Sequence, residues 1–231
     1  MKKISIYTAS FALILSIYLF NSCKKNKEST SVSDVDGNIY KIVTIGTQTW
    51  MAENLRTTKY STGEVIGTTT PATLDISAIV NNNYPKYQWA YAGVESNVST
   101  YGRLYSWYAV TDTRNICPTG WHVPSDSEWT TLTTFLGGEN IAGGKLKDTL
   151  TIHWQSPNTS ASNESGFTSL PGGFRDNDGS FYEIGTSGAW WCSSEYGTSL
   201  AWFRAMYYQY PYVYRSYLNK SIGCSIRCLK N

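Results

Sequence analysis

The sequence predicts an α+β domain, because the pattern of the chain changes midway. Ser125 and Glu128 have the Ser-x-x-Glu spacing of a helix capping box. Apolar residues then follow at helical spacing: Trp129, Leu132 and Leu136. From Gly166 onward, short apolar and aromatic runs alternate with turn sequences, which is typical of antiparallel strands. Helices before strands, without a repeat of fixed period, favour one α+β domain.

The N-terminus predicts export, a lipid anchor and a tether. An uncharged apolar run from Ile4 to Phe20 follows two lysines and ends in small or neutral residues before Cys23. This is typical of a lipoprotein signal peptide over residues 1–22, cleaved so that lipid is attached to the Cys23 thiol. The alternative is an uncleaved anchor helix, although 17 residues is short for a bilayer span. The polar residues 23–33 predict a flexible tether, and residues 34–231 form the predicted domain.

The charged residues of the chain bear on its localisation and on its binding partners. Lys24 follows Cys23, and by the general sorting rule a residue that is not acidic at this place favours the outer membrane. From Asp34 onward, the chain has 14 Lys and Arg against 16 Asp and Glu, a net charge of −2. No basic face is evident, so we expect a membrane-anchored protein that does not bind nucleic acid.

In the N-terminal half, the pattern predicts a hairpin, long loops and a helix. Ile39–Ile45 and Gln48–Leu55 are the expected hairpin strands. Thr57–Thr100 has little periodicity and is rich in turn residues, so we expect loops there, with Asn81–Asn83 as an exposed tip. Tyr101–Thr111 places Leu, Trp and Tyr on one helical face and predicts a helix.

In the C-terminal half, the helix that follows Ser125 should end at Gly137-Gly138, and Gly143-Gly144 should open a loop region that extends to Asn163. A tight turn is expected at Asp176–Gly179. Four further strands are predicted: Ala189–Ser193, Leu200–Tyr208, Val213–Leu218 and Ile222–Leu229.

Four cysteines remain once Cys23 is lipidated, and an even number in an exported chain predicts disulfides. Cys224 and Cys228 lie about 13 Å apart along one predicted strand, too far to bond to each other. Of the two remaining pairings we favour Cys117–Cys228, which would tie the two halves together, with Cys192–Cys224 between neighbouring strands. A metal site at Cys224 and Cys228 is disfavoured, because neither histidine has ligand spacing. No cofactor is expected.

Six segments of the sequence, and the order in which they occur, resemble those of a known protein family. These are Asp36–Tyr40, Trp50–Leu55, Tyr101–Tyr105, Cys117–Pro124, Pro171–Arg175 and Ser225–Cys228. Together they resemble the Fibrobacter succinogenes major paralogous domain, found in exported proteins and lipoproteins of Bacteroidetes-type bacteria. The resemblance implies a C-type-lectin-like or formylglycine-generating-enzyme-like fold, with a terminal hairpin, two helices and a small twisted antiparallel sheet.

The resemblance also bears on the cysteines. Cys117 and Cys228 match family cysteines, whereas Cys192 and Cys224 stand where the family more often has Ser and an aromatic residue. Their joint presence implies an extra bridge in this chain. The family supplies no firm activity, so only fold analogy bears on function.

Catalytic and metal sites have weak support in the sequence. Asp176–Gly179 lacks the further carboxylates of a calcium loop, so a hairpin turn is favoured. The Glu-Pro-Asn motif of many C-type lectins is missing, which disfavours calcium-dependent sugar binding. His122 is expected to be a structural, hydrogen-bonded residue. The Cys-x-x-x-Cys spacing that ends at Cys228 resembles that of copper-binding formylglycine-generating oxidases, but disulfide pairing is favoured.

Aromatic residues crowd the last third of the chain. Trp202-Phe203 and Tyr207-Tyr208 are adjacent pairs, so one member of each should face away from the other along a strand. Exposed aromatic rings suit sugar or protein ligands, and the alternative is a large aromatic core. The candidate ligand-binding aromatics are Trp191, Trp202, Tyr208, Tyr210, Tyr212 and Tyr214.

The sequence therefore predicts a lipid-anchored, non-catalytic binding module of the cell envelope, with a glycan or an envelope protein as its ligand. One rival is an oxidase of the formylglycine-generating type, which needs a pocket with two free thiols. The other is a structural surface protein without a ligand. An exposed aromatic groove would favour the binding module.

Overall fold

The computed structural model describes residues 30–78 and 86–231. The predicted signal peptide, Cys23, most of the tether and the expected loop tip Asn81–Asn83 lie outside the described residues. Within the described ranges, no helix is long and apolar enough to cross a membrane.

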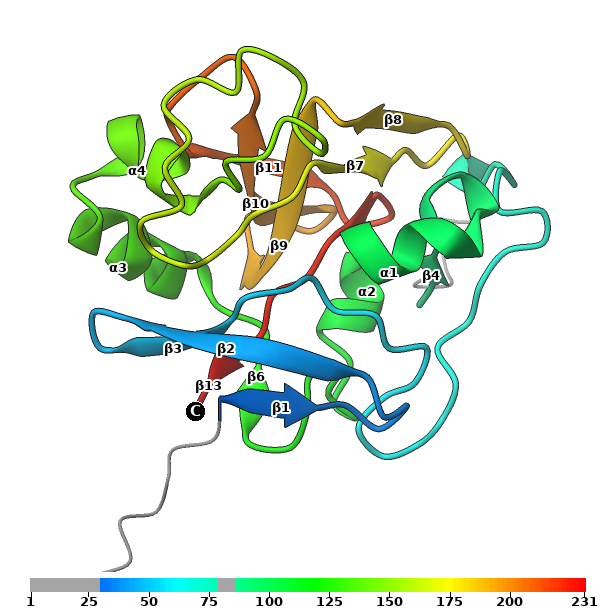
Figure 1. Cartoon of the computed structure of the whole chain (residues 1–231). Helices are drawn as coiled ribbons and strands as arrows, with labels where there is room; N and C mark the ends of the chain where they lie inside the picture. The colour runs from blue at the N-terminus through cyan, green and yellow to red at the C-terminus, as the bar shows by residue number, and fades with distance from the viewer. Residues whose placement is uncertain (1–29, 79–85) are drawn as a thin grey trace, which may run out of the picture.

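The two ends of the described chain meet in one antiparallel sheet of five strands, at the bottom of Figure 1. In spatial order these strands are β1 (Ser31–Ser33), β2 (Ile39–Ile45), β3 (Gln48–Met51), β13 (Leu229–Lys230) and β6 (Trp121–His122). Leu229 pairs with Trp50 on one side and with His122 on the other. The last strand is therefore inserted between the N-terminal hairpin and the middle of the chain.

The second sheet has eight strands, and each of its long members carries at least two aromatic residues. Its order is β11 (Tyr214–Asn219), β10 (Leu200–Tyr207), β9 (Ser187–Glu195), β7 (Gly172–Arg175), β12 (Gly223–Cys224), β5 (Leu104–Ser106) and β4 (Gln88–Trp89), with β8 (Phe181–Ile184) paired to β7. The pairs are antiparallel except β7 with β9, which run parallel. The expected turn between β7 and β8 is present, since the Asp176 N–H donates to the Ser180 carbonyl at 2.8 Å.

Two helices lie against one face of the second sheet: α3 (Asp126–Phe135) and α4 (Glu139–Leu146). The predicted capping box is present at α3, where the Ser125 hydroxyl accepts from the Glu128 N–H and the Glu128 carboxylate accepts from the Ser125 N–H. Two shorter helices, α1 (Val98–Tyr101) and α2 (Trp107–Val110), flank β5. Single 3-10 turns precede α1: η2 (Tyr91–Gly93) and η3 (Glu95–Asn97).

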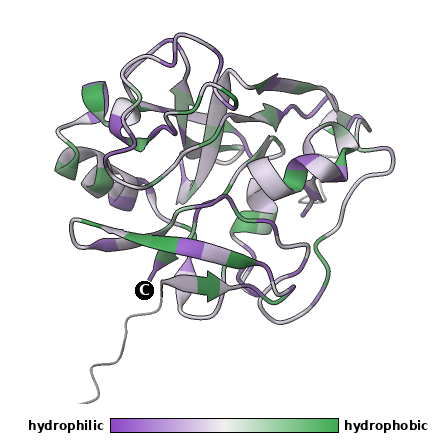
Figure 2. Cartoon of the chain, in the orientation of Figure 1, coloured by the Kyte–Doolittle hydropathy of each residue, from purple (hydrophilic) through white to green (hydrophobic). Residues whose placement is uncertain are grey.

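The second sheet separates two hydrophobic cores, as the alternation along β10 shows. Phe203 and Ala205 belong to one core, whereas Met206 belongs to the other with Trp129 of α3. Hydrophobic and hydrophilic residues both occur along β2 (Figure 2), in which Tyr40 and Ile45 are buried whereas Ile39, Lys41 and Thr44 are exposed. The domain is thus α+β, with more strand than helix.

Some predicted elements were wrong. The helix expected over Tyr101–Thr111 is interrupted by β5. Gly102 has φ +77°, and a Cβ there would lie 2.6 Å from the Asn54 Cβ, so the chain turns at this point instead of continuing as helix. Residues 31–33 of the expected tether form β1, which pairs with β2. The strand expected over Ile222–Leu229 is divided into β12 and β13, which belong to different sheets.

Gly143 and Gly144 lie inside α4, although they predicted a loop. A Cβ at Gly143 would lie 2.4 Å from the Tyr212 carbonyl oxygen, and one at Gly144 would lie 2.5 Å from the Ser160 carbonyl oxygen. The two glycines therefore allow main chain to pack directly on the helix, which the local sequence does not reveal.

Acid should weaken the N-terminal hairpin through Asp36. Partial burial opposes ionisation of this carboxylate, but hydrogen bonds from Thr58, Lys59 and Thr57 outweigh it and lower the pKa of Asp36 to about 2. Since the folded-state pKa is depressed, this stabilisation is present above the unfolded pKa and lost as the pH falls through 2. We expect Asp36→Asn to flatten the pH dependence of the unfolding free energy between pH 4 and pH 2, as measured by urea titration. An unchanged slope would contradict this role.

Candidate functional site

The disulfide between Cys117 and Cys228 is present, with the two Cα atoms 5.9 Å apart. It joins the segment before β6 to the segment before β13. The predicted second bridge was wrong, because Cys192 and Cys224 are both free, buried thiols.

The register of β9 against the segment after β12 explains why these two cysteines do not bond. Trp190 pairs with Ser225 in a parallel bridge, so their side chains share one face. Cys192 is two residues from Trp190 and points to that same face, whereas Cys224 is adjacent to Ser225 and points to the other. Cys192 accordingly packs in the core beneath α3, and Cys224 packs in the opposite core.

The six candidate aromatic residues do not form one surface. Trp191 is fully buried, and its Nε1–H donates to the Tyr105 carbonyl at 2.7 Å. Tyr208 is partly buried against the core beneath α3 and α4. Trp191 therefore has no free ring face for ligand stacking.

Trp202 lies in an aromatic group on the helical side of the sheet, which we call the Trp202 cluster (Tyr196, Trp202 and Tyr217). Tyr196 stacks on Tyr217 with centroids 3.9 Å apart, and the Arg215 guanidinium lies 3.9 Å from the centroid of Trp202. Trp202 also packs partly against the core beneath the helices.

The remaining three candidates gather on the opposite face, at the turn between β10 and β11. We call this group the tyrosine cluster: Tyr207, Tyr210, Tyr212 and Tyr214. Tyr210 stacks on Tyr212 at 4.8 Å, and Tyr207 makes edge contacts with Tyr210 and Tyr214 at 6.5 Å each. Tyr210 and Tyr214 have exposed fractions of 43% and 45%. The cluster thus presents rings to solvent in a continuous row.

A cavity of about 170 Å³ adjoins this row through Tyr207. We call it the Glu183 pocket. Its apolar lining consists of Phe174, Ala189, Phe203, Ala205, Tyr207 and Leu218. Two polar residues complete it: the Ser187 hydroxyl donates to the Glu183 carboxylate at 2.5 Å. Burial, followed by the negative charge of Glu183, raises the pKa of Tyr207 to about 12.

Lys147 supports the turn that carries the tyrosines. Its side chain is buried, and its Nζ donates to the carbonyl oxygens of Thr159, Tyr207 and Tyr210, each at 3.0 Å. Burial lowers the pKa of Lys147 to about 8. All three ammonium donors are used on main-chain acceptors, so the lysine fixes the turn from inside the molecule.

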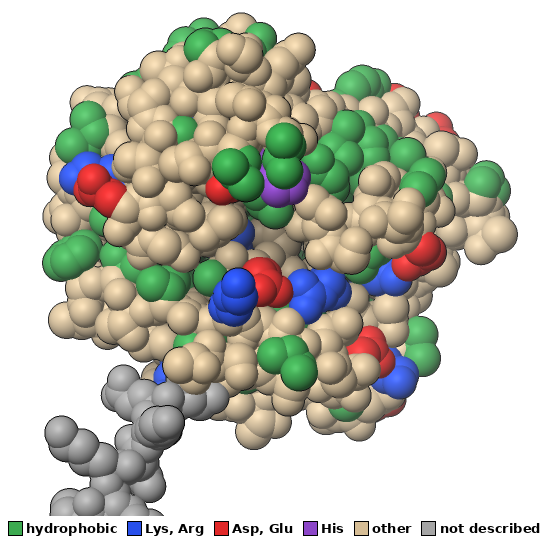
Figure 3. All heavy atoms as spheres, in the orientation of Figure 1, with side chains coloured by type: hydrophobic (Ala, Val, Ile, Leu, Met, Phe, Trp, Pro, Cys, Tyr) green, Lys and Arg blue, Asp and Glu red, His purple; other side chains and the backbone are tan. Residues whose placement is uncertain are grey.

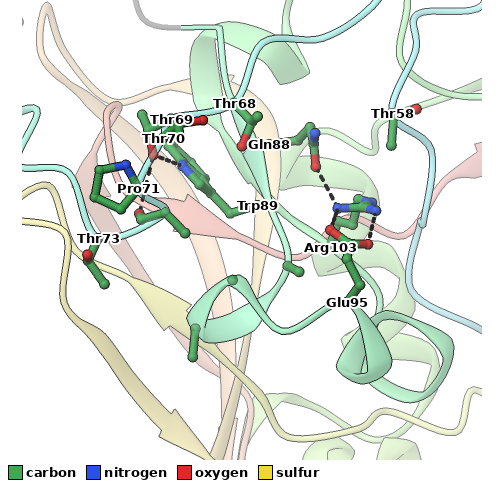
Figure 4. A pocket seen from close by; sticks show the side chains of 14 residues that line it. Thr58, Thr68, Thr69, Thr70, Pro71, Thr73, Gln88, Trp89, Glu95 and Arg103 are labelled. Atoms are coloured by element: carbon green, nitrogen blue, oxygen red, sulfur yellow. Dashed lines mark hydrogen bonds and ion pairs between the residues drawn. The ribbon is translucent and has the colours of Figure 1, made fainter.

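A second concave surface, which we call the threonine cleft, has a volume of about 490 Å³ and is shown in Figure 4. Several threonines line it, and Arg103 lies at one side, beside Gln88 and Glu95. The Arg103 guanidinium donates to Gln88 at 3.0 Å and to both Glu95 oxygens, so its charge is already paired. Trp89 donates to Thr69 and is only 1% exposed. The cleft therefore offers polar edges but no free aromatic face.

The other candidate groups have structural contacts. His122 Nε2 lies 3.0 Å from the Glu128 carboxylate, and its Nδ1 lies 2.6 Å from the Asn231 side-chain oxygen, as expected for a structural histidine. Within residues 30–78 and 86–231, no group of three or more His, Cys, Asp and Glu side chains is placed to hold a metal ion. On the face shown in Figure 3, acidic and basic side chains lie side by side.

Several residues of the six segments meet at Asn54. Its side-chain oxygen accepts from Trp190 Nε1 at 2.9 Å and from Arg227 Nε at 3.0 Å. Its amide nitrogen donates to the Tyr101 carbonyl at 2.8 Å and lies 3.4 Å from the Ser225 hydroxyl. Because Asn54, Trp190 and Arg227 are buried, this network joins four distant segments and is structural.

Sequence reasoning missed the pocket residues Phe174, Glu183 and Ser187. Alternation did predict correctly that the adjacent pairs at Trp202 and Tyr207 point to opposite faces. The excess of aromatic residues was the only feature of the sequence that could have indicated the pocket. The residues next to Glu183 in the sequence do not reveal that β8 places it in one pocket with Phe203 of β10.

The comparisons with known proteins agree with the resemblance in the sequence. The model of the Fibrobacter succinogenes major domain family matches residues 43–230 of the chain. No curated protein and no solved structure matched in the other two comparisons. The match includes the whole second sheet, the disulfide and the tyrosine cluster, but in the first sheet it leaves out β1 and the start of β2.

Proposed function

Because the chain belongs to the Fibrobacter succinogenes major domain family, we propose that it is a lipid-anchored binding module of the cell envelope, whose tyrosine cluster binds glycan. The family has no known catalytic role. The single observation that carries the proposal is the row of exposed tyrosine rings beside the Glu183 pocket.

The chemistry of a tyrosine row suits sugars. A tyrosine presents an apolar ring that can stack on the C–H face of a sugar and a hydroxyl that can hydrogen-bond to it. Tyr210 and Tyr214 keep nearly half of their surface exposed. Lys147 holds the main chain at Tyr207 and Tyr210, so little ordering of the turn would accompany binding.

We also propose that the domain has a C-type-lectin-like fold. In support of a C-type-lectin-like arrangement, the C-terminal β13 pairs with β3 of the N-terminal hairpin. Two helices, α3 and α4, and a larger, mostly antiparallel sheet lie beside this terminal sheet. The known C-type-lectin calcium motif is not part of the proposal, since the sequence lacks it.

The oxidase alternative has lost its main support. It required two free thiols in one pocket, but Cys228 is bonded to Cys117, and the two free thiols belong to different cores. An envelope protein remains the second candidate ligand, because exposed tyrosines also occur at protein interfaces.

Replacing Tyr210 with alanine should weaken glycan binding at least tenfold, equivalent to about 1.4 kcal/mol. The measurement is affinity for glycans selected on an array, using the full chain in detergent. Tyr217→Ala is a matched control, because Tyr217 is also 43% exposed but lies in the Trp202 cluster on the opposite face. Binding that depends on Tyr217 and not on Tyr210 would place the site in the Trp202 cluster. No glycan binding at all would favour a protein ligand or none.

The lipid anchor is tested separately. Cells that produce the full chain should incorporate labelled palmitate into it, and Cys23→Ser should abolish the label, because Cys23 supplies the only thiol at the predicted cleavage site. Lipid that persists on the Cys23→Ser protein would refute the anchor. Because Lys24 follows Cys23, membrane fractionation should recover the wild-type protein with the outer membrane.

A further inference from the structure

The Glu183 pocket combines aromatic walls with a carboxylate that has no cationic partner. Phe174, Phe203 and Tyr207 supply three rings to its lining. Among the described residues, Glu183 forms no ion pair with Lys, Arg or His. Its carboxylate accepts a hydrogen bond from the neutral Ser187 hydroxyl. The pocket lining therefore combines a negative charge with aromatic rings, two kinds of group that attract cations.

The backbone at Glu183 is unusual for this residue type. Its φ is +66°, in the left-handed region, which costs a non-glycine residue roughly 1–2 kcal/mol. Asn or Gly would adopt this conformation more easily. A strained position that directs a carboxylate to a pocket is typical of functional sites.

The size of the pocket limits what enters it. Small-molecule sites commonly have volumes of roughly 300–1,000 Å³, and this pocket has about 170 Å³. One substituent or one ring fits, but an oligosaccharide does not. The rest of a longer ligand would lie along the tyrosine cluster, which begins at Tyr207 on the pocket wall.

We propose that the glycan bound by the tyrosine cluster carries a free amino group, and that its ammonium enters the Glu183 pocket. Aromatic rings with a nearby carboxylate recognise substituted ammonium groups through cation–π and ionic attraction. An acetylated amine has no charge and gains neither term. The inference rests on the proposed glycan function and names the chemical class of the glycan as amino sugar.

The experiment compares two probes that differ mainly in acetylation. Glucosamine oligomers and N-acetylglucosamine oligomers of equal length are titrated against the full chain in detergent, with ligand-observed NMR as the readout. Wild-type protein should bind the glucosamine oligomer at least tenfold more tightly. Glu183→Gln keeps an oxygen acceptor for Ser187, so it should fold normally, and it should reduce the preference to less than threefold.

Glu64→Gln is the control for nonspecific charge attraction, because Glu64 is exposed and the substitution removes the same charge elsewhere. It should leave the preference intact. Equal binding of both oligomers, or equal loss in both variants, would overturn the inference. The proposed function would survive that result if N-acetylglucosamine oligomers or array glycans still depended on Tyr210.

Choline and its uncharged isostere 3,3-dimethylbutan-1-ol distinguish an amino sugar from a lipid head group. Glu183-dependent binding of choline, together with no preference between the oligomers, would overturn the amino-sugar assignment and identify a head-group site. Binding of the glucosamine oligomer that exceeds that of choline at least tenfold supports the assignment, since only the sugar also contacts the tyrosine row.

Discussion

Cys117→Ser should lower the unfolding free energy by about 5 kcal/mol, the largest single-site effect that we expect. The bond to Cys228 spans 111 residues, and closing a loop of that length removes about this much chain entropy from the unfolded state. Urea unfolding of the oxidised protein is the measurement. Reduction of the wild-type protein should reproduce the stability of the variant.

The same experiment tests whether a second bridge exists. With only one disulfide, a reductant should have no further effect on Cys117→Ser/Cys228→Ser, because Cys192 and Cys224 are already thiols. Cys192→Ala serves as the control and should cost only about 1–2 kcal/mol, through loss of a small buried group. Further destabilisation of the double variant by reductant would show that Cys192 and Cys224 are bonded after all.

Asn54→Leu should cost about 3–5 kcal/mol, the second largest effect. The substitution leaves Trp190 Nε1 and Arg227 Nε without their shared acceptor, and it removes the donor to the Tyr101 carbonyl. Each unpaired buried polar group costs roughly 1–3 kcal/mol, and more when it is charged. Burial already lowers the pKa of Arg227 to about 9, so the guanidinium depends on its remaining acceptors.

Asn97→Ala is a matched control, since Asn97 donates one partly buried bond to the Tyr91 carbonyl. It should cost less than about 1 kcal/mol in the same urea titration. If both variants lose similar stability, Asn54 is not the centre of the network.

Local residue chemistry was sufficient for several parts of the molecule. The capping box at Ser125, the hairpin from Ile39 and the turn at Asp176–Gly179 depend on neighbours within a few residues, and all three are present. The opposite orientation of Trp202 and Phe203 follows from strand geometry alone. Cys117–Cys228 could also be predicted, because each cysteine lies in a distinctive segment of the family pattern.

Contacts between distant segments decided the rest. Gly102 ends a helix because Asn54 lies against it, and Gly143 stays in a helix because the chain at Tyr212 packs on it. In both cases the contacting residue is far from the glycine in the sequence. The missing second bridge depends on the register between Trp190 and Ser225, and a shift of one residue would reverse the face of every side chain.

The sequence by itself determined the class of the domain, the capped helix, the disulfide that closes it and the abundance of aromatic residues. Only the tertiary structure decided which aromatics are core and which are surface. Trp191 is fully buried while Tyr210 is exposed, because β9 is an interior strand and the turn after β10 is at an edge of the sheet. The Glu183 pocket arises in the same way, since β7, β8, β9, β10 and β11 each contribute to its wall. Strand order and register fix such a site, and both are set by pairing over long sequence distances.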